Sequence, residues 1–221
     1  MTATLEKIHL NHHNDYRRSA RSDNVDVLSE IYRDDTNIAI WQRQLSDSVK
    51  DTVNQLIDND ITISSTVQPD TVISTLTDNR LSITNPSLSE LVFELVDTFC
   101  RLFEQSHVGL RISTLHNAMC PKFHVDRLPC RLVTTLHGVG TEWLPHDVVD
   151  RSKLGTGSLG LPDDRSGLYN SSTDIQQLTT GDVALLKGEL WKGNEGAGLV
   201  HRSPTVCPSE KRVLLTLDFI N

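Results

Sequence analysis

The sequence has no long hydrophobic stretch, few cysteines and no excess of basic residues. Its apolar runs are only a few residues long, such as Leu91-Val92-Phe93, whereas a helix that crosses a bilayer needs about 20. Residues 1–21 are polar and carry charges of both signs, without the apolar core of a secretory signal peptide. These absences predict a protein that is not exported, has no membrane partner and resides in the cytoplasm.

The charge balance argues against a nucleic acid partner. Lys and Arg total 21 against 29 Asp and Glu, so the formal net charge is −8, which repels phosphates, and no basic patch offsets it. Apolar residues make up 37% and charged residues 23%, a composition that predicts a folded globular chain. Without export, four cysteines are more typical of thiols or metal ligands than of a disulfide framework.

Hydrophobic periodicity divides the chain into three parts. Residues 1–36 are polar and predict a loosely ordered leader, and residues 37–106 predict an α/β cover. Residues 107–221 predict a mostly β core whose apolar face needs that cover. The expected helices are 47–57 and 86–105, and the expected strands are 37–41, 61–63, 108–115, 130–136, 183–186 and 212–219.

A possible metal site begins with His124 and Asp126. On an extended backbone, residues i and i+2 point to the same side, so this imidazole and this carboxylate converge on one small object. His201, next to an apolar pair typical of a strand, is the best third ligand. Two histidines and one carboxylate form the facial triad that favours Fe(II), because it leaves three coordination positions open.

Arg212 begins the last expected strand, eleven residues after His201. In a double-stranded β-helix, antiparallel neighbours bring this guanidinium toward the same cavity, where its planar fork suits a dicarboxylate. 2-Oxoglutarate is the obvious ligand. Arg131 and Lys187 are reserve carboxylate binders if Arg212 points outward.

The order His-x-Asp, His, Arg resembles the Fe(II)- and 2-oxoglutarate-dependent oxygenase superfamily over about residues 108–220. Four segments within this region are similar to a bacterial family known as domain of unknown function 1826. They are Phe123-His124-Val125-Asp126-Arg127, Gly140-Thr141-Glu142-Trp143-Leu144, Val200-His201-Arg202-Ser203-Pro204 and Leu215-Thr216-Leu217-Asp218-Phe219.

The resemblance implies an α+β fold with a C-terminal double-stranded β-helix, of jelly-roll or cupin-like shape, under an N-terminal helical and mixed cover. It implies that His124, Asp126 and His201 bind Fe(II), and that Arg212 binds the co-substrate 2-oxoglutarate. The implied reaction is the oxidation of an unknown small-molecule or peptide substrate. One position departs from the superfamily, because Leu214 stands where a serine is frequent.

Other interpretations remain open at this stage. Zinc fits the same three ligands, and they also suit a cupin-like protein that binds or senses a metal without catalysis, or an interaction module with a vestigial site. A rival zinc set takes its ligands from His116, Cys120, His124 and Cys130, although their spacing is irregular. A purely structural reading has His124 capping a turn, Asp126 paired with Arg127 and His201 in the core.

Three residues near the expected site are secondary candidates. Glu142 holds a metal ligand or a substrate amine, Trp143 stacks on substrate, and Arg202 orients it; the alternatives are an aromatic plug for Trp143 and an exposed strand edge for Arg202. Residues 145–180 predict a functional lid or a mobile insertion. The Gly-x-Gly-x-x-Gly of residues 155–160 lacks the flanking strand and helix of a dinucleotide site, so we expect a flexible loop without nucleotide.

Overall fold

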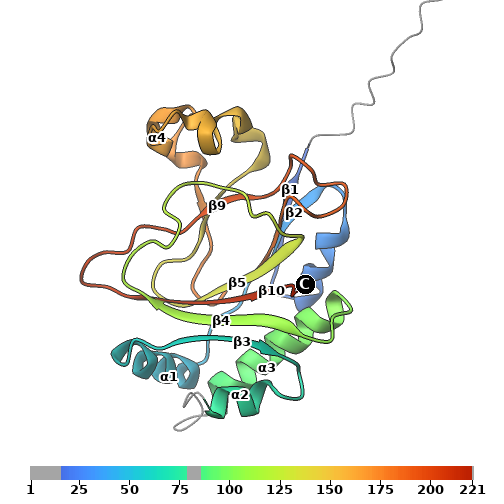
Figure 1. Ribbon diagram of the computed structural model, residues 1–221, viewed down its shortest axis with the longest axis vertical. Helices are drawn as coiled ribbons and strands as arrows, with labels where there is room; N and C mark the ends of the chain where they lie inside the picture. The colour runs from blue at the N-terminus through green and yellow to red at the C-terminus, as the bar shows by residue number, and fades with distance from the viewer. Residues whose placement is uncertain (1–15, 79–85, 221) are drawn as a thin grey trace, which may run out of the picture.

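The structure is a computed structural model that describes residues 16–78 and 86–220. Two sheets and several helices make up this part of the chain, and helices α1, α2 and α3 lie together on one side of the large sheet (Figure 1). The α-helices are α1 (Asp47–Asp58), α2 (Val72–Asp78), α3 (Pro86–Leu102) and α4 (Asp163–Ser166). The 3₁₀ helices are η1 (Val25–Tyr32), η2 (His146–Val148), η3 (Arg151–Lys153), η4 (Gly155–Ser158) and η5 (Ser172–Asp174).

The large sheet has seven strands in the order β1-β2-β8-β5-β10-β4-β3, and all neighbours are antiparallel except β1 and β2. Its strands are β1 (Arg18–Ser22), β2 (Thr36–Trp41), β3 (Thr62–Val67), β4 (Val108–Leu115), β5 (Cys130–His137), β8 (Val183–Lys187) and β10 (Arg212–Asp218). The small sheet consists of β7 (Gln176–Gln177), β6 (Glu142–Leu144) and β9 (Val200–Arg202).

The two faces of the large sheet differ because side chains alternate along each strand. On β10, Val213, Leu215 and Leu217 are fully buried in the main core with the apolar sides of α1 and α3. The opposite residues Leu214 and Thr216 line a cavity. The cover that the apolar face requires is therefore supplied by helices from the first half of the chain, as expected.

Helix α1 shows how local sequence sets an element's start. The hydroxyl of Ser46 accepts a hydrogen bond from the backbone N–H of Val49, which satisfies one of the free donors of the first turn. Val53 and Leu56 follow on the buried side of the helix.

The expected leader is wrong for the residues that the structure describes. Residues 18–22 form β1, which pairs with β2, and residues 25–32 form η1, whose Leu28 and Ile31 are buried in the main core. The reason is that the short amphipathic stretch of η1 buries its apolar side despite polar surroundings. Residues 1–15 lie outside the described residues. The large sheet also crosses the expected boundary at residue 106, because β3 pairs with β4 and β2 pairs with β8.

Within the described residues, no helix is long and apolar enough to span a bilayer.

Candidate metal centre

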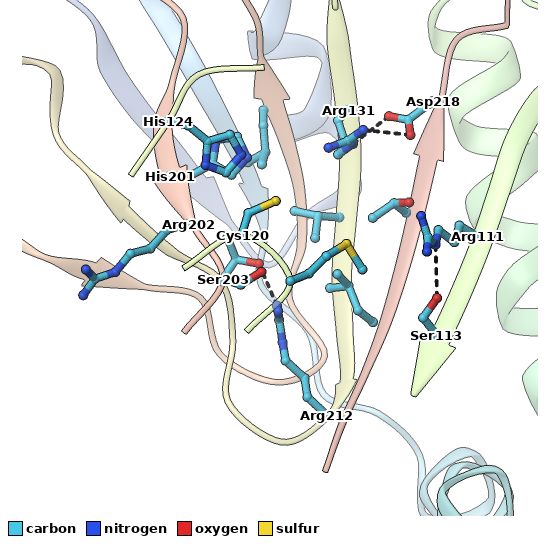
Figure 2. Close-up of a pocket in the computed structure, with 16 residues that line it drawn as sticks. Arg111, Ser113, Cys120, His124, Arg131, His201, Arg202, Ser203, Arg212 and Asp218 are labelled. Carbon is cyan, nitrogen blue, oxygen red and sulfur yellow. Dashed lines mark hydrogen bonds and ion pairs between the residues drawn. The ribbon is translucent and has the colours of Figure 1, made fainter. Parts of the chain in front are cut away.

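His124 and His201 face each other across the small sheet. Their backbones exchange two hydrogen bonds of 3.0 Å in an antiparallel bridge, and their ring centroids lie 4.6 Å apart. This pairing extends the small sheet to the segment that carries the His-x-Asp motif. The two imidazoles, 77 positions apart in sequence, are thus held side by side by main-chain geometry (Figure 2).

Each imidazole presents the same nitrogen to the site. Nδ1 of His124 lies 2.9 Å from the carbonyl oxygen of Lys122, and Nδ1 of His201 lies 3.1 Å from that of Leu199. A carbonyl only accepts, so in each ring Nδ1 is the donor and Nε2 carries the free electron pair. Backbone contacts of this kind orient histidine ligands in metal sites.

The Asp126 carboxylate completes the cluster. Its Oδ1 lies 3.7 Å from His124 Nε2 and its Oδ2 lies 3.6 Å from His201 Nε2. The three ligand atoms all lie within 4.8 Å of one another, and no other set of three His, Cys, Asp or Glu side chains gathers this way in the described part of the chain. Burial lowers the pKa of His201, with Asp126 opposing the shift, so the ring is neutral at neutral pH, as metal binding requires.

The rival zinc set is not assembled. His116 lies at 2.9 Å from Asp60 on the surface, and Cys130 is fully buried in the main core, where burial raises the pKa of its thiol. Cys120 is exposed and lines the cavity beside the histidines. The structural pairing expected for Asp126 is also wrong, because its partner is Arg131, at 2.8 Å, rather than its exposed neighbour Arg127.

Arg212 points into the same cavity as the histidines and is 1% exposed. One amino group donates to the hydroxyls of Thr135 at 3.1 Å and Thr141 at 2.8 Å, whereas Nε is buried without a partner among the described residues. Burial lowers the pKa of Arg212 to about 10, with Glu142 opposing, so the guanidinium stays charged at neutral pH. A buried cation with an unused donor calls for an anion.

The three secondary candidates, Glu142, Trp143 and Arg202, lie on the small sheet. Glu142 and Arg202 stand opposite each other on β6 and β9 and form an ion pair of 2.6 Å, and Arg202 also lines the cavity. Their roles toward a substrate stay predictions. Trp143 is 3% exposed, packs in a cluster with Ile38 and Leu178, and does not line the cavity. Its cross-strand partner is His201, and stacking of a substrate on Trp143 stays a prediction. Lys187, the reserve carboxylate binder, is buried on the core side and donates to the carbonyl of Arg33.

Sequence analysis missed Asp163, which lies in the segment of unknown role. Its Oδ2 accepts from the backbone N–H of Phe123 at 2.9 Å and from Arg202 at 3.1 Å. These residues directly precede His124 and follow His201, so one buried carboxylate connects the two histidine segments. The segment forms short helices rather than a featureless loop, and the glycine-rich residues 155–158 form η4. In the sequence, the only signal near Asp163 is the charged turn that follows Pro162.

The chain belongs to the family described as "Protein of unknown function (DUF1826)", which matches residues 22–218. None of the curated proteins matches the chain in sequence. Among solved structures it is similar to dioxygenase for auxin oxidation 1 from Arabidopsis thaliana in complex with 2-oxoglutarate, with 10% identity over 93% of this chain and 92% of that one, at a TM-score of 0.47.

Two bacterial structures are similar as well. One is a prolyl-4-hydroxylase from Pseudomonas putida, with 10% identity, 87% of this chain and 96% of that chain covered, and a TM-score of 0.44. The other is HygX from Streptomyces hygroscopicus with nickel, 2-oxoglutarate and hygromycin B bound, with 10% identity, 88% and 86% covered, and a TM-score of 0.40.

Proposed function

We propose that this protein is an Fe(II)- and 2-oxoglutarate-dependent oxygenase that oxidises a small-molecule or peptide substrate. The observation that carries the proposal is that one cavity is lined by both histidines of the His-Asp-His cluster and by a buried arginine whose Nε has no partner among the described residues. A protein that only binds a metal needs the His-Asp-His cluster but does not need the buried arginine. We interpret the two sheets that enclose the cavity as the halves of a double-stranded β-helix.

His124, Asp126 and His201 fit a divalent metal in number, chemistry and spacing. Two neutral imidazole nitrogens and one carboxylate oxygen are the donors of the facial triad, which suits Fe(II). Zinc suits the same donors, and its general affinity is higher. The choice of iron therefore depends on Arg212, because zinc supports no oxidation.

Arg212 fits one carboxylate of 2-oxoglutarate. Its guanidinium lines the cavity as a charged donor, and the hydroxyls of Thr135 and Thr141 lie beside the amino group. Leu214, which stands where a serine was expected, has Thr135 as its cross-strand partner on β5. The neighbouring strand thus provides the hydroxyl that Leu214 lacks.

Iron and 2-oxoglutarate, when bound, would supply the oxidising chemistry, with O₂ as the oxidant and succinate and CO₂ as the products of 2-oxoglutarate. The protein's residues bind and orient. The backbone bridge between His124 and His201 sets the spacing of the ligands, and Arg131 holds Asp126 in place. Arg212 would hold the distal end of the co-substrate in the same cavity.

The test is whether 2-oxoglutarate changes the visible absorption spectrum of Fe(II)-loaded protein under anaerobic conditions. We expect a new absorption band that saturates at millimolar 2-oxoglutarate or below. A wild-type protein that binds Fe(II) in a one-to-one ratio and shows no spectral response would overturn the oxygenase proposal in favour of a metal-binding or metal-sensing role.

A variant locates the co-substrate. Arg212→Ala removes a charge-assisted hydrogen bond of about 1.5–3 kcal/mol, so 2-oxoglutarate should bind roughly 10- to 100-fold more weakly while the metal content is unchanged. Arg212→Lys keeps the charge without the planar fork and should lie between. Arg101→Ala is the matched control, because Arg101 is exposed on α3, which packs on the opposite face of the large sheet.

A further inference from the structure

Arginines dominate the charged residues that line the cavity. Although the net charge is −8, Asp218 is the single acidic residue that lines the cavity, and the basic lining residues are four arginines. They are Arg111, Arg131, Arg202 and Arg212. An anion is attracted to an arginine whose charge is not neutralised by a carboxylate.

Three of these arginines are accounted for. Arg131 pairs with Asp126 and Asp218, and Arg202 pairs with Glu142 and Asp163. Arg212 is the residue proposed above to hold 2-oxoglutarate. Ion pairs of this kind neutralise a guanidinium and occupy its donors.

Arg111 on β4 is the remaining arginine. Its Nε donates to the hydroxyl of Ser113 at 3.2 Å, and among the described residues it takes part in no ion pair. Its side chain extends from β4 toward the cavity, on the side away from His124 and His201 (Figure 2). Arg111 thus offers a full charge and most of its donors to a ligand.

Strand register separates Arg111 from Arg212. Arg111 stands opposite Thr216 on β10, four residues after Arg212. At about 3.3 Å per residue, this places the two positions about 13 Å apart along the sheet. A 2-oxoglutarate held by Arg212 and by the metal therefore leaves Arg111 available for another molecule.

Part of the wall of the cavity is apolar. Met119, Val133, Leu186 and Leu214 line it. Such a surface suits a hydrocarbon body rather than a sugar or a polar peptide. A cation and apolar side chains in the lining of one cavity suit an amphipathic ligand with an anionic end.

We propose that the substrate of this site is a small apolar carboxylic acid, and that Arg111 binds its carboxylate. The inference rests on the proposed oxygenase function and adds the class of substrate. A carboxylate matches the planar fork of a guanidinium bidentately. A phosphate dianion is disfavoured because Asp218 lies in the same cavity wall. With the carboxylate held at Arg111, the hydrocarbon body extends along the apolar wall toward the metal ligands.

The experiment uses full-length protein loaded with Zn(II) and titrated in a calorimeter in the presence of saturating 2-oxoglutarate. The probes are phenylacetate and hexanoate, each paired with its uncharged amide. We expect each acid to bind at least 10-fold more tightly than its amide. Arg111→Ala should weaken acid binding roughly 10- to 100-fold and leave amide binding unchanged, with Arg111→Lys between.

The variants discriminate between outcomes. Metal content and 2-oxoglutarate affinity should be the same in wild type, Arg111→Ala and the charge-matched control Arg101→Ala. If Arg111→Ala weakens 2-oxoglutarate itself, or if acids and amides bind wild type equally, the substrate inference is wrong while the oxygenase proposal stands. If wild type binds no 2-oxoglutarate, the oxygenase proposal fails, and this inference fails with it.

Discussion

The guanidinium of Arg131 donates to Asp126 Oδ2 at 2.8 Å while it forms a fork with both carboxylate oxygens of Asp218, at 2.7 and 3.0 Å. Burial lowers the pKa of Arg131, but the bonds to Asp218 and the charge of Asp126 outweigh it and leave the pKa raised. Arg131 is therefore always charged. Through it, the large sheet holds the carboxylate of the metal cluster, whereas the small sheet holds the imidazoles.

The first prediction concerns this fork. Arg131→Met leaves two partly buried carboxylates without their cation, so we expect it to lower the free energy of unfolding by about 3 kcal/mol. Asp218→Asn should cost less, and the double variant should cost less than the sum, with a coupling of about 1–3 kcal/mol. Urea unfolding of the metal-free protein measures all four proteins. Additive effects would mean that Arg131 and Asp218 do not stabilise the protein through their contact with each other.

The second prediction concerns the metal ligands. His124→Ala and His201→Ala each remove one of three donors, so each should abolish the binding of one Fe(II) or Zn(II) per chain. His116→Ala is the matched control, because His116 is exposed and pairs with Asp60 outside the cavity. Metal analysis after dialysis provides the measurement. Retention of one metal per chain by both site variants would place the site elsewhere.

The third prediction concerns Asp163. Asp163→Asn replaces a charged acceptor with a neutral amide between the N–H of Phe123 and the guanidinium of Arg202. We expect a loss of about 1–3 kcal/mol in the free energy of unfolding and weaker metal binding, because the segments that carry His124 and His201 lose their connection.

Asp164→Asn is the control for this prediction, since Asp164 is the exposed neighbour on α4. If both variants bind metal as wild type does, Asp163 stabilises the segment only and does not position the histidines.

Contacts between residues close in sequence could be predicted, whereas contacts between distant residues could not. His124 and Asp126 are two positions apart, so an extended backbone suffices to predict their convergence. The residues that hold Asp126 in place could not be predicted from local spacing. Arg131 meets Asp218 across 87 positions, and only the register of β5 against β10 brings them together.

The same limit explains why Glu142 and Arg202 were expected to act on substrate. Each is a charged residue beside the site in sequence, but the register of β6 and β9 makes them partners of each other. Trp143 stands opposite His201 across β6 and β9, so the two side chains lie on the same face, but Trp143 is buried in an apolar cluster and does not line the cavity. Strands and long helices were predictable from periodicity, whereas β1 and η1 were missed because their polar residues obscured a buried side.

Lys187 on β8 is a lysine buried in the core of the protein. Its side chain is 1% exposed, donates to the carbonyl of Arg33 at 2.8 Å, and lies 4.9 Å from the ring centroid of Trp191, with no carboxylate in an ion pair among the described residues. Burial lowers the pKa of Lys187 to about 8, whereas an exposed lysine has a pKa near 10.5. The folded protein thus releases this proton at a lower pH than the unfolded chain does.

The fourth prediction follows from that difference. Between pH 8 and 10.5 the unfolded state binds more protons than the folded state, so the contribution of Lys187 to the free energy of unfolding increases as the pH rises through this window. Below pH 8 both states are protonated and the contribution is constant. We expect Lys187→Met to remove a pH-dependent gain on the order of 3 kcal/mol. The melting temperature of wild type should therefore rise relative to that of the variant from pH 7.5 to pH 10. Parallel melting curves over this range would show that Lys187 titrates as an exposed lysine, contrary to its position in the core.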